Sequence, residues 1–336
     1  MPNRDIIVVG TSTGGVEALS LLVRELPSGF PASLFIVCHF PAEGRSILPE
    51  ILSRAGPLLA SHAIDGESFY PGHIYVAPPG YHLLLGPGGK MRLSRGAREN
   101  HHRPAVDPLF RSTARYYGDR AIGVILTGAL SDGTAGLLAI RNAGGLAIVQ
   151  DPRDAALAAM PQNAFKIAGA DYVVSVAELG PLLVNLVLER AGPYQGDRAM
   201  DPIERMPDLV DRDMEKQSQN ENRGHVSVFT CPECGGSLWQ GDEPDLLRFR
   251  CHVGHAYNAE VLLSEQGEAL EAALWTAVRT FRERAVLSRQ LAFKERAGGD
   301  AGTAERFEEQ AALADRHGEL IQEYLLKGPS PTFQSI

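Results

Sequence analysis

Residues 6–15 read IIVVGTSTGG, a short β-branched run that breaks into a turn of Gly, Ser and Thr before a helical pattern. Such a run predicts a buried strand, and the turn puts Ser12 where the strand ends and a helix begins. A hydroxyl at that point lies beside the free N–H groups of a helix N-terminus. The stretch therefore predicts either a nucleophile for acyl chemistry or a phosphate site.

The rest of the first 190 residues repeats this alternation of apolar runs and helical patterns. We expect strands at 6–9, 34–38, 121–127, 147–150 and 172–174, and helices at 15–25, 46–54, 108–117, 134–142, 161–168 and 177–190. This alternation favours an α/β fold with a mostly parallel, doubly wound sheet and helices on both faces. The runs at 73–77 and 82–85, around Pro78-Pro79-Gly80, predict a small antiparallel excursion at the sheet edge.

Length and composition indicate a globular chain with more than one region. Its 336 residues are 44% hydrophobic, enough for a full core and a second small domain. There is no run of about eighteen apolar residues and no basic-then-apolar leader, so we expect no membrane insertion, no signal peptide and a cytoplasmic location. The net charge of −9 falls entirely in residues 193–336, which argues against nucleic acid as a partner.

The Gly-rich turn is a poor nucleotide site, because its glycines follow neither the G-x-G-x-x-G nor the Gly-Lys-Ser/Thr pattern. A nucleophile would need a base and an orienting acid from other strand ends, since ligands gather beyond the carboxyl edge of such a sheet. His39 directly follows the second predicted strand, and Asp132 lies in the loop after the third. Each could instead be an ordinary loop residue or helix cap.

We predict that Ser12, His39 and Asp132 form a catalytic triad. His39 would take the proton of Ser12, and Asp132 would fix the imidazole tautomer and stabilise the imidazolium. Backbone N–H groups near Thr13 would receive the oxyanion. Among the other histidines, the pair His101-His102 could line a cleft.

Six short motifs follow one another in this part of the chain. They are residues 7–15, His39-Phe40-Pro41, VAPPG at 76–80, RPAVDPLF at 103–110, Leu126-Thr127-Gly128 followed by Asp132-Gly133, and Gln150-Asp151 leading to Met160-Pro161. In this combination residues 4–190 resemble the catalytic domain of chemotaxis-type protein-glutamate methylesterases. The matching Ser, His and Asp form the triad of that family.

The resemblance implies hydrolysis of glutamate γ-methyl esters on the signalling helices of chemoreceptors, with release of methanol, and often deamidation of glutamine at the same sites. Both reactions pass through an acyl-enzyme and an oxyanion, so one triad can serve both. The family's Arg-Pro-x-Val-Asp loop borders its active site, which implies that Arg103 lies on the substrate side. The alternative is a non-catalytic adaptor that binds receptors or signalling partners.

Two departures from the family pattern concern the acid loop and the start of the chain. Family members usually carry Met where this chain has Ala129, so we expect a different substrate-side wall or oxyanion environment. The family's full-length form begins with a phospho-accepting receiver domain, whereas this sequence starts at the first catalytic strand. We therefore expect no regulation by phosphorylation of an N-terminal receiver.

Three of the four cysteines fall in one short segment. Cys231-Pro-Glu-Cys234 is followed, after sixteen residues, by Cys251-His252-Val-Gly-His255. Three thiolates and one imidazole predict a closed structural Zn²⁺ site, and the Cys-x-x-Cys-Gly-Gly step resembles a zinc-ribbon knuckle. His255 is the expected fourth ligand and His252 the alternative; a reduced set of buried cysteines would need no metal. No cofactor is expected for catalysis.

These patterns divide the chain into four regions. We expect a methylesterase catalytic domain at 1–192, a polar linker at 193–224, a zinc-ribbon-like module at 225–258 and an antiparallel helical hairpin at 259–328. The hairpin could dock a partner, dimerise or pack within the chain, and we expect the last.

Overall fold

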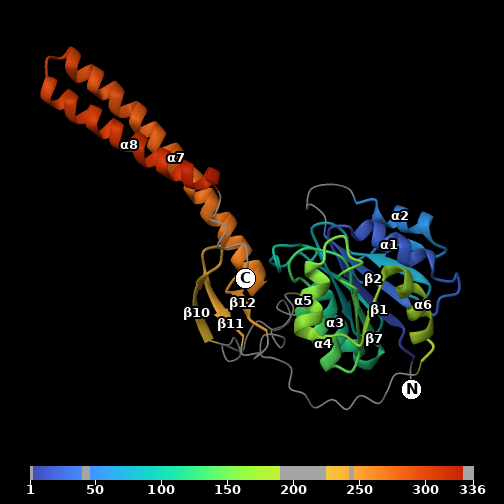
Figure 1. Ribbon diagram of the computed structural model, residues 1–336. Helices are drawn as coiled ribbons and strands as arrows, with labels where there is room; N and C mark the ends of the chain where they lie inside the picture. Colours follow the sequence, from blue (N-terminus) through green and yellow to red (C-terminus); the bar gives the residue numbers. More distant parts are fainter. Residues whose placement is uncertain (1–2, 40–45, 190–224, 242–245, 328–336) are drawn as a thin grey trace. The chain divides into compact units, whose positions relative to one another are not determined.

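The computed structural model describes residues 3–39, 46–189, 225–241 and 246–327 (Figure 1). They divide into two compact units, Met1–Leu262 and Leu263–Ile336. The predicted linker at 193–224 lies outside the described residues, as do Phe40 and Pro41 of the His39 motif.

A seven-stranded parallel sheet forms the centre of the first unit. Its strands are β1 (Ile6–Thr11), β2 (Ser33–Cys38), β3 (Leu59–His62), β4 (His73–Val76), β7 (Ala121–Ile125), β8 (Leu146–Gln150) and β9 (Tyr172–Val174). Their order across the sheet is β3-β4-β2-β1-β7-β8-β9, and all neighbours run parallel. The carboxyl ends of all seven strands therefore meet at one edge of the sheet.

Helices cover both faces of this sheet, as predicted. The helices are α1 (Gly15–Arg24), α2 (Leu48–Ala55) and α6 (Val176–Leu186) on one face, and α3 (Val106–Tyr117), α4 (Thr134–Asn142) and α5 (Ala159–Ala168) on the other. A hydrophobic core lies on each face of the sheet. The side chains of β1 enter the two cores alternately, because successive strand side chains point to opposite faces. Ile7 and Val9 join the first core, and Ile6 and Val8 join the second. This arrangement confirms the doubly wound α/β fold.

The antiparallel excursion is a separate hairpin of β5 (His82–Gly86) and β6 (Lys90–Ser94). The prediction was wrong for 73–77, because β4 pairs with β2 in parallel, with Leu34 opposite Ile74. β3, which the apolar pattern did not reveal, pairs with β4 in parallel at the sheet edge. A parallel pairing depends on the crossover that joins the strands, and the helix-free segment 63–72 gives no local signal of one. A short 3-10 turn, η1 (Gly118–Arg120), leads into β7.

A second, antiparallel sheet follows in the same compact unit. Its strands, in spatial order, are β10 (His225–Thr230), β11 (Ser237–Gln240), β12 (Arg248–Cys251) and β13 (Ala256–Asn258). We name residues 225–262 the Cys/His module. Its core is small, with Leu238, Phe249, Tyr257 and Leu262 as its large members. A core of this size needs a further source of stability, such as a metal ion.

The second unit consists of most of α7 (Ala259–Ala297) together with α8 (Ala301–Lys327), and it confirms the predicted helical hairpin. The pairs Arg289–Asp315 and Arg296–Glu308 run in opposite order along the two helices, which shows that the helices are antiparallel. Alanines at the buried seam allow close approach of the helices. Across the described ranges, no helix is both long enough and apolar enough to cross a membrane.

Candidate active site

The strand order reverses between β1 and β7, which is where parallel α/β sheets usually bind ligands. Ser12 follows β1, and Asp132 lies in the loop after β7. His39 directly follows β2, the neighbour of β1 on its other side. The fold therefore brings the three predicted triad residues to adjacent strand ends.

Ser12 lies in the tight turn between β1 and α1. Its N–H donates to the carbonyl of Thr127 at 3.0 Å. Gly14 takes a left-handed φ of 79°, which favours glycine. Gly128 passes so close that a Cβ on it would lie 2.9 Å from the Ser12 Cβ. Glycines thus allow two loops to meet around a half-buried hydroxyl at the start of α1.

His39 and Asp132 form a buried hydrogen-bonded pair. His39 Nε2 lies 2.8 Å from Asp132 Oδ2, and the two side chains are 5% and 2% exposed. The other ring nitrogen, Nδ1, is buried and has no hydrogen-bond partner within the described residues, Ser12 included. The carboxylate therefore favours the tautomer that carries its proton on Nε2, and Nδ1 keeps the lone pair that can take a proton. A bond from the nucleophile to such a base often forms only with substrate bound.

Four donors surround the carboxylate of Asp132. Besides His39, its Oδ2 accepts from the N–H of Val106 at 2.7 Å. Its Oδ1 accepts from Asn100 Nδ2 at 2.8 Å and from the N–H of Asp107 at 3.3 Å. Burial raises the pKa of Asp132, but the hydrogen bonds from His39 and Val106 outweigh burial and hold this pKa below its usual value. Asp132 is therefore ionised at neutral pH.

A second buried carboxyl group, Asp107 at the start of α3, lies beside Asp132. It accepts from the N–H of Gly136 at 2.7 Å and from Asn100 Nδ2 at 2.9 Å. Burial and the charge of Asp132 raise the pKa of Asp107 to about 6. The amide of Asn100 thus bridges both carboxyl groups. Asp107 stood inside a quoted motif without a role, and no pattern in the sequence singled out Asn100.

His102 stacks on the ring of His39. The ring centroids are 3.6 Å apart and the ring planes differ by 15°. Burial, and then the neighbouring His39, lower the pKa of His102 to about 3, so this ring is neutral at physiological pH. A neutral ring supports the base by packing and adds no competing positive charge.

Acid should destabilise the protein partly through His102. Its folded pKa lies below its unfolded value of about 6.5, so the unfolded chain binds more protons and stability falls as pH drops below that value. We expect His102→Phe, which keeps the stacked ring without titrating, to lose less stability than wild type between pH 7.5 and 5.5 in urea unfolding. His317→Phe, at an exposed position of α8, is the control. Equal losses in wild type and His102→Phe would contradict this expectation.

Thr13 and Arg103, the other two predicted residues, lie in loops at this carboxyl edge. The carbonyl of Thr13 accepts from Thr127 Oγ1 at 2.9 Å. Arg103 Nη1 donates to the carbonyl of Gly96 at 2.7 Å, so its guanidinium ties the loop after β6 to the loop before α3. Ala129 is exposed.

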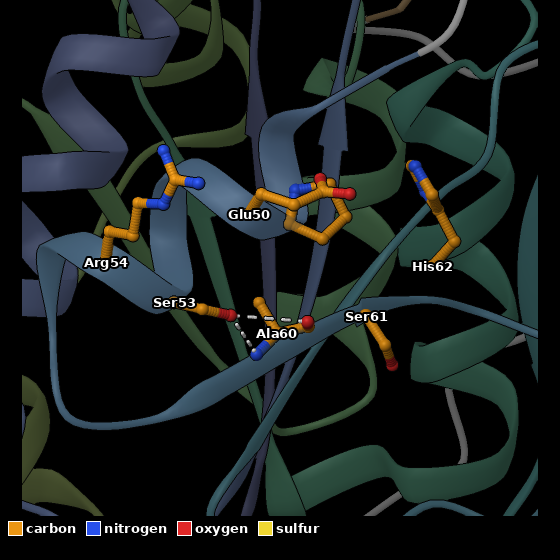
Figure 2. Close-up of a pocket in the computed structure, with 7 residues that line it drawn as sticks. Glu50, Ser53, Arg54, Ala60, Ser61 and His62 are labelled. Carbon is orange, nitrogen blue, oxygen red and sulfur yellow. Dashed lines mark hydrogen bonds between the residues drawn. The ribbon is translucent and has the colours of Figure 1, made fainter.

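An open hollow of about 440 Å³ lies between α2 and β3 (Figure 2). It is lined by Pro49, Glu50, Ser53, Arg54, Ala60, Ser61 and His62. Figure 2 shows the Ser53 hydroxyl held against the backbone of Ala60, whose N–H donates to it at 2.9 Å. None of the predicted triad residues lines this hollow, and its two serine hydroxyls are already bonded, Ser53 to the backbone of Ala60 and Ser61 to His73 Nε2 at 2.9 Å. The chemistry therefore belongs to the strand-order reversal.

The Cys/His module gathers Cys231, Cys234, Cys251 and His255, whose ligand atoms all lie within 4.8 Å of one another. His255 Nδ1 is 3.6 Å from Cys231 Sγ and 3.5 Å from Cys251 Sγ, and the Sγ atoms of Cys234 and Cys251 are 3.6 Å apart. Tetrahedral zinc bonds of about 2.3 Å to sulfur and 2.0 Å to nitrogen give ligand separations of about 3.5–3.8 Å. The donor set and these three separations are therefore compatible with Zn²⁺.

The choice between the two histidines follows from the same geometry. His255, not His252, joins the cluster, and His252 is exposed. His255 Nε2 lies 3.2 Å from Glu233 Oε2, so a carboxylate orients the ring with Nδ1 toward the thiols. Gly235, with a left-handed φ of 70°, lets its N–H donate to the carbonyl of Cys231 at 2.8 Å and closes the knuckle.

Comparisons with known proteins concern the catalytic part of the chain. The sequence model of the CheB methylesterase family matches residues 7–183. A putative protein-glutamate methylesterase/protein-glutamine glutaminase of Leptospira interrogans (strain Fiocruz L1-130) is 40% identical over 184 residues, 55% of this chain and 95% of that protein. The protein-glutamate methylesterase/protein-glutamine glutaminase of Pectobacterium atrosepticum is 38% identical over 182 residues, 53% of this chain and 52% of that protein.

A solved structure agrees with these relatives. The CheB methylesterase catalytic domain of Thermotoga maritima matches with a TM-score of 0.53 and 34% sequence identity, over 56% of this chain and 100% of that chain. The Cys/His module and the helical hairpin lie outside the family match, which ends at residue 183.

Proposed function

Because this chain belongs to the CheB methylesterase family, we propose that it hydrolyses glutamate γ-methyl esters, and deamidates glutamine, on chemoreceptor-like signalling proteins. The observation that carries the proposal is the buried pair of His39 and Asp132 at the strand-order reversal, with Nδ1 of His39 left without a partner among the described residues. Ser12 lies at the adjacent strand end. An adaptor that only binds receptors would need neither a buried base nor an ionised acid.

In the acylation step, Ser12 Oγ attacks the γ-carbonyl carbon of the substrate and His39 Nδ1 takes the serine proton. Asp132 stays ionised and stabilises the imidazolium through Nε2. The tetrahedral oxyanion would be received by N–H groups near Thr13, at the positive end of α1. The imidazolium then protonates the leaving group, which departs as methanol from an ester or ammonia from an amide, and an acyl-enzyme remains.

In the deacylation step, His39 takes a proton from the water that attacks the acyl-enzyme, and the imidazolium returns this proton to Ser12 Oγ as the acyl bond breaks and glutamate leaves. Arg103 would contact the substrate, and its bond to Gly96 supports that role because it holds the guanidinium in place. The exposed Ala129 leaves more room at the entrance than a methionine would. These assignments follow the family's motif position by position.

The direct test is methanol release from a methylated receptor fragment by the full chain. Release of methanol supports the enzyme. Binding of the receptor without methanol release would favour the adaptor instead.

We propose that Cys231, Cys234, Cys251 and His255 hold one structural Zn²⁺, which would tie the knuckle to β12 and supply folding energy to a small core. Three thiols kept reduced for metal binding fit the cytoplasm, where we place the protein. The domain limits of 1–192, 193–224, 225–258 and 259–328 stay part of this proposal. The helical hairpin is the candidate surface for a further partner.

We expect about one zinc per chain in protein purified under reducing conditions. The double variant Cys231→Ser/Cys234→Ser should lose it, because two of the four ligands lose their thiolates. Elemental analysis measures the stoichiometry, and Cys38→Ala, which alters a buried thiol of β2 outside the cluster, should keep the metal. Metal-free wild-type protein, or zinc retained by the double variant, would contradict the assignment.

A further inference from the structure

The last strand of the Cys/His module, β13, lies against the loop that precedes α3. The N–H of Asn100 donates to the carbonyl of Ala256 at 2.8 Å, and the N–H of Ala256 donates to the carbonyl of Arg98 at 3.3 Å. These bonds form a parallel bridge between Glu99 and Ala256. β13 therefore pairs with the start of the loop before α3. The end of the same loop and the start of α3 supply two backbone donors to Asp132, the N–H groups of Val106 and Asp107.

Asn100 connects this strand to the catalytic acid through its side chain. Its Oδ1 accepts from the N–H of Asn258 at 2.9 Å, while its Nδ2 donates to Asp132 at 2.8 Å and to Asp107 at 2.9 Å. Asn100 and Asn258 are 2% and 1% exposed. Because Asn258 occupies the amide oxygen, the amide nitrogen must point at the two carboxyl groups. The module thus determines which way this amide faces.

A second contact reaches the loop of the acid itself. Asn258 Nδ2 donates to the carbonyl of Ser131 at 3.0 Å, and Ser131 Oγ donates to Glu260 Oε2 at 3.1 Å. Ser131 is the residue immediately before Asp132 and is fully buried. Two side chains of the module therefore hold Ser131, next to the catalytic acid: Asn258 bonds its backbone carbonyl and Glu260 its hydroxyl.

A buried ion pair anchors the same interface. Glu99 Oε1 accepts from Arg111 of α3 at 2.9 Å and from Arg250 of β12 at 3.1 Å. Burial raises the pKa of Glu99, but the two guanidinium groups outweigh burial and hold this pKa far below its usual value. Arg250 directly precedes the metal-cluster residue Cys251, and Ala256 directly follows His255. The strands that carry the cluster are therefore the strands that contact the catalytic loops.

We propose that β12 and β13 of the Cys/His module position the catalytic acid: β13 orients Asn100, Asn100 orients the carboxylate of Asp132, and loss of the metal site lowers turnover at a triad that the metal site does not touch. Asn100 and Asn258 are positioning residues, since they act on the substrate only through Asp132 and His39. The inference rests on the proposed function where kcat is measured. Where hydrogen exchange is measured, it rests only on the contacts of Asn100.

Two substitutions at Asn100 separate positioning from simple structural support. Asn100 has a left-handed φ of 49°, which glycine and aspartate accept more readily than alanine. Asn100→Gly removes the amide, and we expect kcat to fall about tenfold with KM within about twofold. Asn100→Asp keeps an acceptor for Asn258 but places a third carboxylate beside Asp132 and Asp107, so we expect kcat to fall about a hundredfold.

A purely structural role predicts the opposite order. Aspartate would then keep the link to β13 and be the milder change, and glycine would be the more damaging one. From the module's side, Asn258→Ala should lower kcat about threefold with KM unchanged, because it releases the Ser131 carbonyl. The matched control is Val228→Ala, on the exposed edge strand β10, which should leave kcat unchanged.

Metal removal tests the coupling in the full chain. Treatment with a chelator, with zinc content measured, should lower wild-type kcat about tenfold but lower the kcat of Asn100→Gly by at most about threefold more, because the link through Asn100 is already broken and only the link through Ser131 remains. Hydrogen exchange should show loss of protection at the Asn100 amide while β1 amides stay protected. Unchanged wild-type kcat after zinc loss, or equal losses in wild type and Asn100→Gly, would overturn the proposal.

The exchange measurement also separates this inference from the proposed function. If zinc-loaded wild-type protein releases no methanol, the proposed function fails. In that case, hydrogen exchange at the Asn100 amide before and after zinc removal still tests whether the metal site is coupled to Asn100. Protection at Asn100 that persists after zinc loss would refute the coupling even in an active enzyme.

Discussion

Ser12→Ala should abolish methanol release, with a fall in kcat of at least about 10³-fold and little change in receptor binding. The reaction requires a bond between Ser12 Oγ and the γ-carbonyl carbon, and alanine offers no atom to form it. His39 could still activate water, but no acyl-enzyme would form. The fall is measured by methanol release from a methylated receptor fragment under saturating substrate.

The control for this experiment is Ser20→Ala in the same α1 helix. The hydroxyl of Ser20 donates to the carbonyl of Val16 at 2.7 Å and is half-buried, so its loss tests the helix without touching the turn. We expect wild-type kcat for Ser20→Ala and an unchanged circular dichroism spectrum for both variants. Wild-type methanol release by Ser12→Ala would refute the triad.

Asp132→Asn should lower kcat on the order of 10⁴-fold, the size found when the acid of a Ser-His-Asp triad becomes an amide. An asparagine amide would turn its N–H groups toward His39 Nε2 or toward the N–H of Val106, where the carboxylate now accepts. Nε2 would then become the acceptor and Nδ1 the protonated nitrogen. The base nitrogen would lose the lone pair that must take the serine proton.

The position of Asp132 adds an acid-dependent effect on stability. Because its folded pKa lies below its unfolded value, the ionised carboxylate stabilises the fold above about pH 4 and the stabilisation is lost as pH falls further. Asp132→Asn should therefore lose less stability on acidification below pH 4 than wild type does in urea titration.

Asp65→Asn, where an exposed carboxylate accepts from the N–H of Leu93 at 2.9 Å, is the matched control for kcat. An Asp132→Asn enzyme with wild-type kcat would exclude Asp132 as the orienting acid.

The alternation of apolar runs and helical patterns was sufficient to predict the fold class. In a βα unit the strand is marked by its apolar run and the helix by its periodicity, and both features are local. The run from Ile6 to Val9 and the turn at Ser12 predicted a strand and a helix start, and β1 and α1 are present there. The position of His39 after an apolar run put it at a strand end. The roles of Ser12, His39 and Asp132 stay predictions, but their adjacency follows from parallel strands that end at one edge.

The pattern failed where pairing depends on the path of the chain. The apolar residues of β4 would suit an antiparallel hairpin as well as a parallel sheet. The path of the chain between β2 and β4 determines that β4 lies parallel to β2. Asn100 and the stacking of His102, which was expected only to line a cleft, were missed for a related reason. Their importance comes from contacts with His39, Asp132 and Asn258, and none of these contacts leaves a period or a spacing in the sequence.

By itself, the sequence determined the alternating α/β fold, the residues available for a triad and the three cysteines of the candidate metal site, because strand, turn and metal-knuckle signals are local; the choice of His255 over His252 needed the structure. Only the tertiary structure decided that Nδ1 of His39 is the nitrogen left for the proton, and that Asn100 bridges Asp132 and Asp107. It also decided that β13 packs against the loops of the catalytic acid. The physical reason is distance along the chain: Asn100 and Asn258 are 158 residues apart, and a hydrogen bond between them depends on how the loop before α3 packs against β13.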